Sequence, residues 1–213
     1  MVVLDASGVG DADARRRYPR SMRRPTIDEV EAIGALPEGL SLAGADVTGC
    51  RFVGVDLTEA SLRGARLTAC RFEHCEMTLV DLTDATLHDV EFDTCRLQAV
   101  AFEATARDPI GLSIAFRDCD LGLATFRGLD LRGCRFEGGH VREAIIVDCD
   151  LREVPLRALD ATGAEIRGCD LRAADMRGST GLVFSPCTNR VHGLRIDAEA
   201  ALGVLAAVGI ACA

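Results

Sequence analysis

The residues that could carry chemistry recur at a spacing of twenty. The tripeptide Asp-Leu-Arg occurs three times, beginning at Asp130, Asp150 and Asp170. If a repeating fold stacks these positions, a column of carboxylates lies beside a column of guanidinium groups. The two columns can pair with each other, or the carboxylates can face a basic partner. The pattern leaves both interpretations open.

Further carboxylates extend this candidate surface. The expected partner-binding set is Asp120, Asp130, Asp150, Asp160, Glu165, Asp170 and Asp175. The chain has 33 acidic residues against 24 basic ones, all of them arginine, and a net charge of −9. A general nucleic-acid binder needs a basic surface, so direct binding to nucleic acid is disfavoured. A protein that competes with nucleic acid for a basic groove is not excluded.

The cysteines and histidines form no recognisable site. Zinc needs converging ligands, and no Cys-x-x-Cys pair occurs among the ten cysteines. The four histidines are isolated. Phosphate-binding loops, nucleophile elbows and His-Glu metal motifs do not occur in the sequence. We therefore expect neither an enzyme nor a metal or cofactor site.

These residues belong to a repeat of five. Every fifth residue from Leu42 to Phe102 is large and apolar, and after a slip in phase the series resumes from Phe116 to Met176, where only Ala161 is small. Two positions before each, most residues are Ala, Cys or Val. Helical periodicity and strand alternation do not fit this pattern, whereas a coil that turns a corner every five residues does.

Four such corners close a square of twenty residues. The spacing then stacks Phe52, Phe72 and Phe92 in one column, and it stacks cysteines whose thiols pack inward as compact apolar groups. Coils in a sheet lie about 4.8 Å apart, so six or seven coils make a rod roughly 30 Å long. The sequence therefore predicts one narrow solenoid.

The units resemble those of the pentapeptide-repeat family, whose motif is a small residue, Asp or Asn, Leu or Phe, and two variable residues. Matching units begin Ala45-Asp46-Val47, Val55-Asp56-Leu57, Cys119-Asp120-Leu121, Cys149-Asp150-Leu151, Cys169-Asp170-Leu171 and Ala174-Asp175-Met176. The resemblance spans about residues 40–180. It implies an all-β fold, a right-handed quadrilateral β-helix.

The segments outside the repeat are expected to cap the coil. Residues 1–38 are expected to form a flexible arm and an N-terminal cap, with a short helix from Thr26 to about Leu36, because Thr26 and Glu29 fit a capping box. The repeat occupies residues 39–180. Residues 181–213 form the C-terminal cap, with a helix that Asp197 caps.

The C-terminal helix is apolar around much of its surface and must bury against something beyond the last coil. The simplest partner is a second copy of the chain in a twofold contact. The expected dimerisation residues are Ala201, Leu202, Leu205, Val208 and Ile210. Residues 193–210 also resemble the C-terminal segment of the Qnr-type and MfpA-type quinolone-resistance proteins, the gyrase-protecting branch of the family, which dimerise there.

Residues 103–113 interrupt the repeat where its phase slips. The Asp-Pro pair and the glycine in this segment predict a bulged or projecting loop. The segment is either a tolerated insertion or a specific contact for a partner. Its candidate contact residues are Arg107, Asp108, Pro109 and Ile110.

The resemblance implies that the partner is a type II topoisomerase, DNA gyrase or topoisomerase IV. An acidic rod would occupy a groove that binds duplex DNA and would counter quinolones or related poisons. The alternative function is a β-helical scaffold that binds a protein unrelated to topoisomerases. The chain has no apolar stretch of about twenty residues and no signal pattern, so we expect a cytoplasmic protein without a membrane partner.

Overall fold

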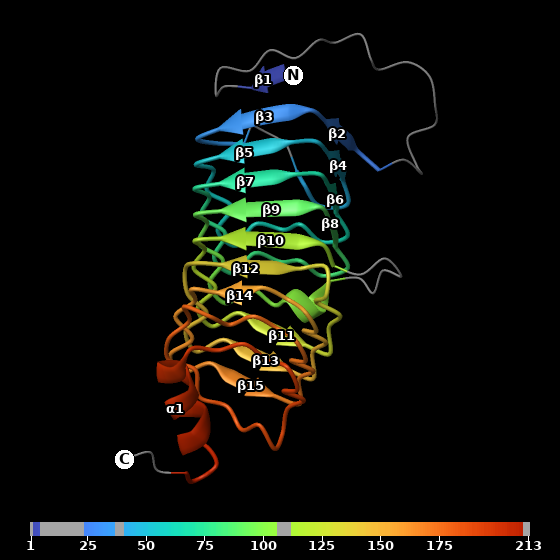
Figure 1. Ribbon diagram of the computed structural model, residues 1–213. Helices are drawn as coiled ribbons and strands as arrows, with labels where there is room; N and C mark the ends of the chain where they lie inside the picture. Colours follow the sequence, from blue (N-terminus) through green and yellow to red (C-terminus); the bar gives the residue numbers. More distant parts are fainter. Residues whose placement is uncertain (1, 5–23, 37–40, 106–111, 211–213) are drawn as a thin grey trace.

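The chain winds into a parallel β-helix, shown as a computed structural model in Figure 1. The structure describes residues 2–4, 24–36, 41–105 and 112–210. Short strands from successive turns stack into three parallel sheets, and helix α1 (Ala198–Ala206) follows the last turn (Figure 1). The predicted all-β solenoid is therefore confirmed.

Three sides of the coil are sheets. The first contains, in order, β1 (Val2–Leu4), β3 (Val30–Ile33), β5 (Arg51–Val53), β7 (Arg71–Glu73), β9 (Val90–Asp93), β10 (Ile114–Arg117), β12 (Arg135–Glu137) and β14 (Leu156–Arg157). The second contains β2 (Thr26–Asp28), β4 (Asp46–Thr48), β6 (Arg66–Thr68) and β8 (Thr86–His88). The third contains β11 (Thr125–Arg127), β13 (Ile145–Val147) and β15 (Glu165–Arg167).

The remaining side is built from turns joined by single parallel β-bridges. One column of bridged residues runs along this side: Asp56, Glu76, Arg96, Asp120, His140, Asp160 and Thr180. Each of them except Thr180 precedes a buried residue of the core, so its side chain points away from the core. Together the four sides give the square coil that the repeat predicts.

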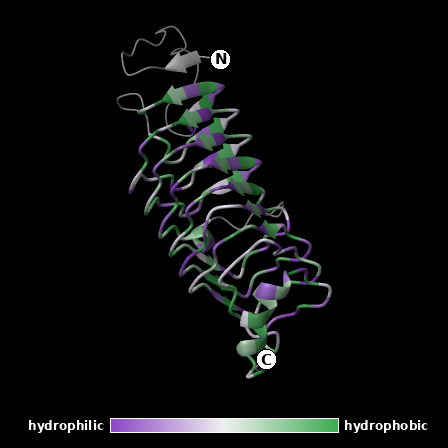
Figure 2. Ribbon diagram, turned by 60° about the vertical axis from the view of Figure 1, so that its left-hand side comes forward, coloured by the Kyte–Doolittle hydropathy of each residue, from purple (hydrophilic) through white to green (hydrophobic). Residues whose placement is uncertain are grey.

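Each five-residue unit is used in the same way. In the unit around Leu67, Ala65 and Leu67 are buried, whereas Arg66 and Thr68 are exposed. Ala69 then adopts a φ of 51°, a left-handed conformation that turns the chain onto the next side. Figure 2 shows the resulting alternation of hydrophilic and hydrophobic residues along the stacked strands.

The core is a set of vertical stacks. The rings of Phe52 and Phe72 lie 4.7 Å apart between centroids, and those of Phe72 and Phe92 lie 5.1 Å apart. The stack continues through Phe116 and Phe136. Such offset ring pairs add to the free energy gained by burying the rings. The predicted phenylalanine column is confirmed.

The slip in phase is an insertion of four residues in one turn. Phe92 pairs with Phe116, a separation of 24 residues, whereas Phe52 pairs with Phe72 at the regular separation of 20. The insertion follows the short 3-10 helix η2 (Phe102–Ala104) in the sequence. The candidate contact residues Arg107, Asp108, Pro109 and Ile110 lie outside the described residues.

The N-terminal helix predicted over residues 26–36 is wrong. This segment forms β2 and β3, in which Ile27 pairs with Val47 and Ala32 pairs with Phe52. Ile27 and Ala32 continue the period of five backward from Leu42, so burial in the coil outweighs the local capping signal. At the other end, bridges such as Asp175 to Arg195 extend the coil beyond residue 180.

The C-terminal helix forms as predicted, but its cap differs. Asp197 occupies the N-cap position of α1 without bonding the helix backbone. Its carboxylate instead accepts a hydrogen bond from the Gly178 N–H at 2.5 Å. The side chain therefore ties the helix to the last turn of the coil.

Candidate functional surfaces

The three repeated Asp-Leu-Arg units form an Asp–Arg ladder, defined as Asp130, Arg132, Asp150, Arg152, Asp170 and Arg172. The aspartates lie in one column, joined by parallel bridges from Asp130 to Asp150 and from Asp150 to Asp170. Arg132 lies 2.6 Å from the Asp130 carboxylate and 3.5 Å from that of Asp150. Arg152 repeats this arrangement with Asp150 and Asp170 at 2.6 and 3.9 Å.

The ladder is electrostatically balanced. Hydrogen bonds from the paired guanidinium group hold the pKa of Asp130, Asp150 and Asp170 below the usual range of an aspartate. Each aspartate also accepts the backbone N–H of the arginine two residues later. Three carboxylates and three guanidinium groups cancel in charge, so the ladder presents a polar but neutral surface.

The other column of carboxylates lies on the side built from turns. We define the acidic side as the carboxylates on or beside that column, namely Asp56, Glu59, Glu76, Asp120, Glu143 and Asp160. Arg96 and Arg142 are the arginines among them. Six carboxylates against two guanidinium groups leave this side with a net charge of −4.

Half of these carboxylates have no cationic partner. Among the described residues, no arginine nitrogen lies within 4.0 Å of Asp56, Glu59 or Glu143, and all three side chains are exposed. Glu76 pairs with Arg96 at 2.9 Å, and Asp160 pairs with Arg142 at 2.6 Å. This side therefore carries negative charge that its own arginines do not balance.

Hydrogen bonds keep part of this charge in place. The Thr162 hydroxyl and backbone N–H both donate to Asp160, and together with Arg142 they lower the pKa of Asp160 to about 2. The backbone N–H of Thr58 donates to Asp56 in the same way, at 2.9 Å, and the pKa of Asp56 is lowered. Both groups are ionised at neutral pH.

The seven predicted partner-binding carboxylates do not share one side. Asp130, Asp150 and Asp170 belong to the ladder, and Asp120 and Asp160 belong to the acidic side. Glu165 begins β15 in the third sheet, where it pairs with Arg167 at 3.0 Å. Asp175 lies on the first sheet's side, below Pro155. The sequence-predicted set is thus divided among all four sides of the coil.

Asp175 is the most enclosed of the seven. Its side chain is 6% exposed and lies between Arg157 at 2.6 Å and Arg177 at 2.8 Å, with Arg195 at 3.8 Å. These arginines hold its pKa far below the usual range. A carboxylate so surrounded is screened from a partner.

The sequence analysis missed Asp56, Glu59, Glu76 and Glu143. Asp56 and Glu76 recur at the spacing of twenty, but the insertion separates them from Asp120 and hides the continuous column. The decisive signal was the residue two positions after each acid. It is Arg throughout the ladder, whereas Asp56 and Glu76 are followed by Thr58 and Thr78.

Helix α1 forms the second candidate surface. Val204 is buried against the core, whereas Leu202 is 50% exposed, and Ala201 and Leu205 are partly exposed. Val208 and Ile210 follow the helix, and Ile210 is 51% exposed. The predicted dimerisation residues thus leave an apolar surface at the end of the coil.

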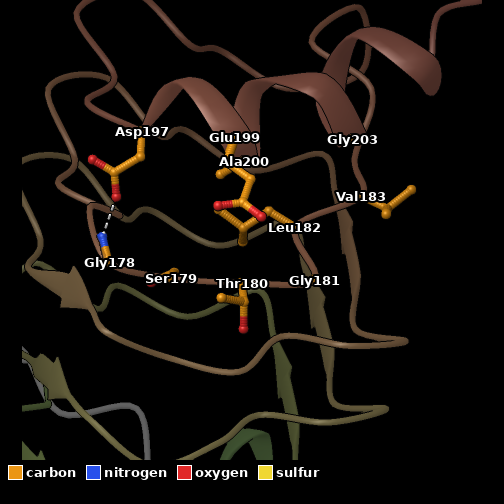
Figure 3. Close-up of a pocket in the computed structure, with 10 residues that line it drawn as sticks. All are labelled: Gly178, Ser179, Thr180, Gly181, Leu182, Val183, Asp197, Glu199, Ala200 and Gly203. Carbon is orange, nitrogen blue, oxygen red and sulfur yellow. Dashed lines mark hydrogen bonds between the residues drawn. The ribbon is translucent and has the colours of Figure 1, made fainter.

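A cavity of about 310 Å³ separates α1 from the last turn. Figure 3 shows its floor, from Gly178 to Val183, and its roof, which carries Asp197 and Glu199. The Asp197 carboxylate bonds Gly178 at one end, and the Glu199 carboxylate hangs above Thr180 and Leu182 (Figure 3). The cavity is thus the space between α1 and the turn against which the helix packs.

Two other kinds of site are absent from the described part of the chain. Within residues 2–4, 24–36, 41–105 and 112–210, no cluster of histidine, cysteine and carboxylate groups could hold a metal ion. No helix in this part of the chain is long and apolar enough to cross a membrane.

Comparison with known proteins identifies the repeat. Residues 45–107 match the family model of the pentapeptide repeat region. No curated protein matches the sequence.

Two solved structures are similar to this chain at low identity. A trypsin-treated variant of QnrB1, a plasmid-mediated fluoroquinolone resistance protein, is 18% identical, with a TM-score of 0.40, and the match covers 90% of this chain and 100% of that one. HetL, a pentapeptide repeat protein involved in heterocyst differentiation regulation in the cyanobacterium Nostoc, is 16% identical, with a TM-score of 0.31 and coverages of 81% and 87%.

Proposed function

We propose that this pentapeptide-repeat protein binds the DNA-binding groove of a type II topoisomerase, DNA gyrase or topoisomerase IV, and modulates that enzyme without catalysing a reaction. In this role it protects the topoisomerase against quinolones or related poisons. The observation that carries the proposal is the acidic side, with its net charge of −4 along one face of a narrow rod.

Charge and shape both support this proposal. Duplex DNA is a rod that proteins hold mainly through its phosphates. The column from Asp56 to Asp160 carries carboxylates at four of its six positions, spaced by multiples of the coil spacing of about 4.8 Å. A groove lined by arginine and lysine attracts either rod by the same long-range field.

A second copy of the chain extends the rod. The apolar surface of α1, which includes Leu202 and Leu205, is proposed to bury against the same surface of another copy. A twofold contact at the C-terminal ends places two acidic sides end to end. The resulting length of roughly 60 Å, twice that of one coil, suits a long groove better than a single coil does.

A supercoiling assay with purified gyrase tests the proposed function. We expect micromolar protein to change supercoiling, or to reduce the DNA cleavage that a fluoroquinolone stabilises. No effect on supercoiling, cleavage or drug sensitivity would contradict the proposal. That result would favour the alternative, a β-helical scaffold for a partner other than a topoisomerase.

A further inference from the structure

A second cavity lies where the four-residue insertion distorts the coil. It measures about 200 Å³ and opens where the neighbouring strands β9, β10 and β12 of the first sheet begin. Its polar lining consists of Asp89, Glu91, Ser113, Arg117 and Arg135.

Small residues leave this space empty. Ala115 pairs with Arg135 in the neighbouring strand, where a longer side chain would fill the cavity. Gly133 lines the floor, and a Cβ atom there would lie 2.6 Å from the carbonyl oxygen of Leu112. Position 133 therefore requires glycine, because the backbone at Leu112, where the chain rejoins the coil, packs directly against it.

Arg135 stands apart from the other arginines. Every other arginine that the structure describes has a carboxylate oxygen within 4.0 Å, whereas Arg135 has none among the described residues. The residues next to it in the adjacent turns of the coil explain this, because they are the uncharged Ala115 and Pro155. In a chain with a net charge of −9, an exposed arginine without an acidic neighbour is the exception.

The charges around the cavity balance, and Arg135 is the cation without a partner among the described residues. Arg117 lies 3.2 Å from Glu91, whose carboxylate also pairs with Arg71. The lining itself is neutral, because Arg117 and Arg135 balance Asp89 and Glu91, and Arg71 lies outside it. Because Arg71 and Arg117 hold Glu91, Arg135 is the cation of the lining that remains for a ligand. The Asp89 carboxylate would repel a multiply charged phosphate chain more strongly than a single carboxylate.

We propose that this cavity binds one carboxylate group, which accepts a forked pair of hydrogen bonds from the guanidinium group of Arg135. Arginine presents parallel N–H donors that match the two oxygens of a carboxylate. The carboxylate comes either from a free small acid or from an acidic side chain of a protein bound to the first sheet.

Titration with sodium acetate at constant ionic strength tests this site, with the arginine Nε–H signals followed by NMR. We expect one signal to shift in a saturable manner. Arg135→Gln should weaken the binding about tenfold or more, because a charge-assisted pair is lost. Arg167→Gln is the matched control, since it removes an exposed arginine that pairs with Glu165 in the third sheet.

A peptide with a single glutamate, compared with its glutamine counterpart, distinguishes the two sources of carboxylate. Glutamate-peptide binding that is much tighter than acetate binding indicates a protein side chain, and equal binding indicates a small free acid. The inference is overturned if neither probe gives a saturable shift, or if Arg135→Gln binds as the parent does. Urea unfolding of both variants, together with Arg135→Lys, separates loss of the site from loss of the fold.

Discussion

The Asp–Arg ladder and the acidic side rest on the same core and the same five-residue unit, yet the ladder is neutral and the acidic side is negatively charged. In the ladder, each aspartate is followed two residues later by an arginine that closes back onto it, as Arg152 does onto Asp150 at 2.6 Å. On the acidic side, the same position after Asp56 and Glu76 holds threonine. The net charge of a side therefore depends on the residue two positions after each acid, and the number of aspartates alone does not give that charge.

Both surfaces are carried by the same phenylalanine core, and disrupting this core should have the largest effect on the stability of the protein. Phe72→Ala opens a cavity between Phe52 and Phe92 and should cost about 3–5 kcal/mol of unfolding free energy. Thr68→Ala changes an exposed side chain outside the core and should cost almost nothing. Equal midpoints of the two variants in urea would contradict the assigned core.

The proposed self-association through α1 would set how far the acidic side extends. Leu202→Glu with Leu205→Glu places charges in the proposed apolar contact and should give monomers of 22.7 kDa in light scattering. Leu79→Glu with Leu123→Glu is a matched control, since these leucines lie on the coil and are 53% and 54% exposed. A dimer that survives the first change but not the second would place the interface on the coil.

Acid should affect the ladder through its carboxylates. Their pKa values are lower in the folded chain than the value of about 3.9 for an unperturbed aspartate. They therefore contribute stability above that value and lose it as the pH falls through the lowered pKa values. Asp130→Asn, Asp150→Asn and Asp170→Asn together should flatten the fall of the urea midpoint below about pH 4. An unchanged pH dependence would show that these pairs add no stability.

Removing a single Asp–Arg pair from the ladder should have the smallest effect on the stability of the protein. Arg152→Thr converts one ladder position to the residue type found after Asp56, at a cost of about 1 kcal/mol or less, because both partners are partly exposed to solvent. Urea unfolding measures the change. A loss of several kcal/mol would mean that the ladder holds the coil together and is not merely a neutral surface.

The repeat was predictable because the coil imposes it on every turn. Burial of one large and one small residue per unit leaves a period that the positions from Leu42 to Met176 display directly. The N-terminal turn was misassigned because Thr26 and Glu29 match a helix cap locally, while the strand is favoured by the period of five and by the distant partners Val47 and Phe52.

The candidate site was less predictable, since it depends on which side of the square each residue occupies. Asp120 and Asp160 were identified, but Asp56 and Glu76 were not assigned to their column, because the four-residue insertion changes the register between them. The isolation of Arg135 likewise arises only when Ala115 and Pro155 become its neighbours in space.

The central claim is that the acidic side contacts a basic groove while the ladder does not, and two matched triple variants test it directly. One carries Asp56→Asn, Glu59→Gln and Glu143→Gln, and the other carries Asp130→Asn, Asp150→Asn and Asp170→Asn. Both remove three negative charges, so any difference between them reflects the side that makes contact.

Affinity for purified gyrase is measured at two salt concentrations for the parent and both variants. The account predicts that the acidic-side variant binds roughly tenfold more weakly at low salt and loses part of its salt dependence, while the ladder variant stays close to the parent. Equal losses in both variants, or no loss in the acidic-side variant, would contradict the claim.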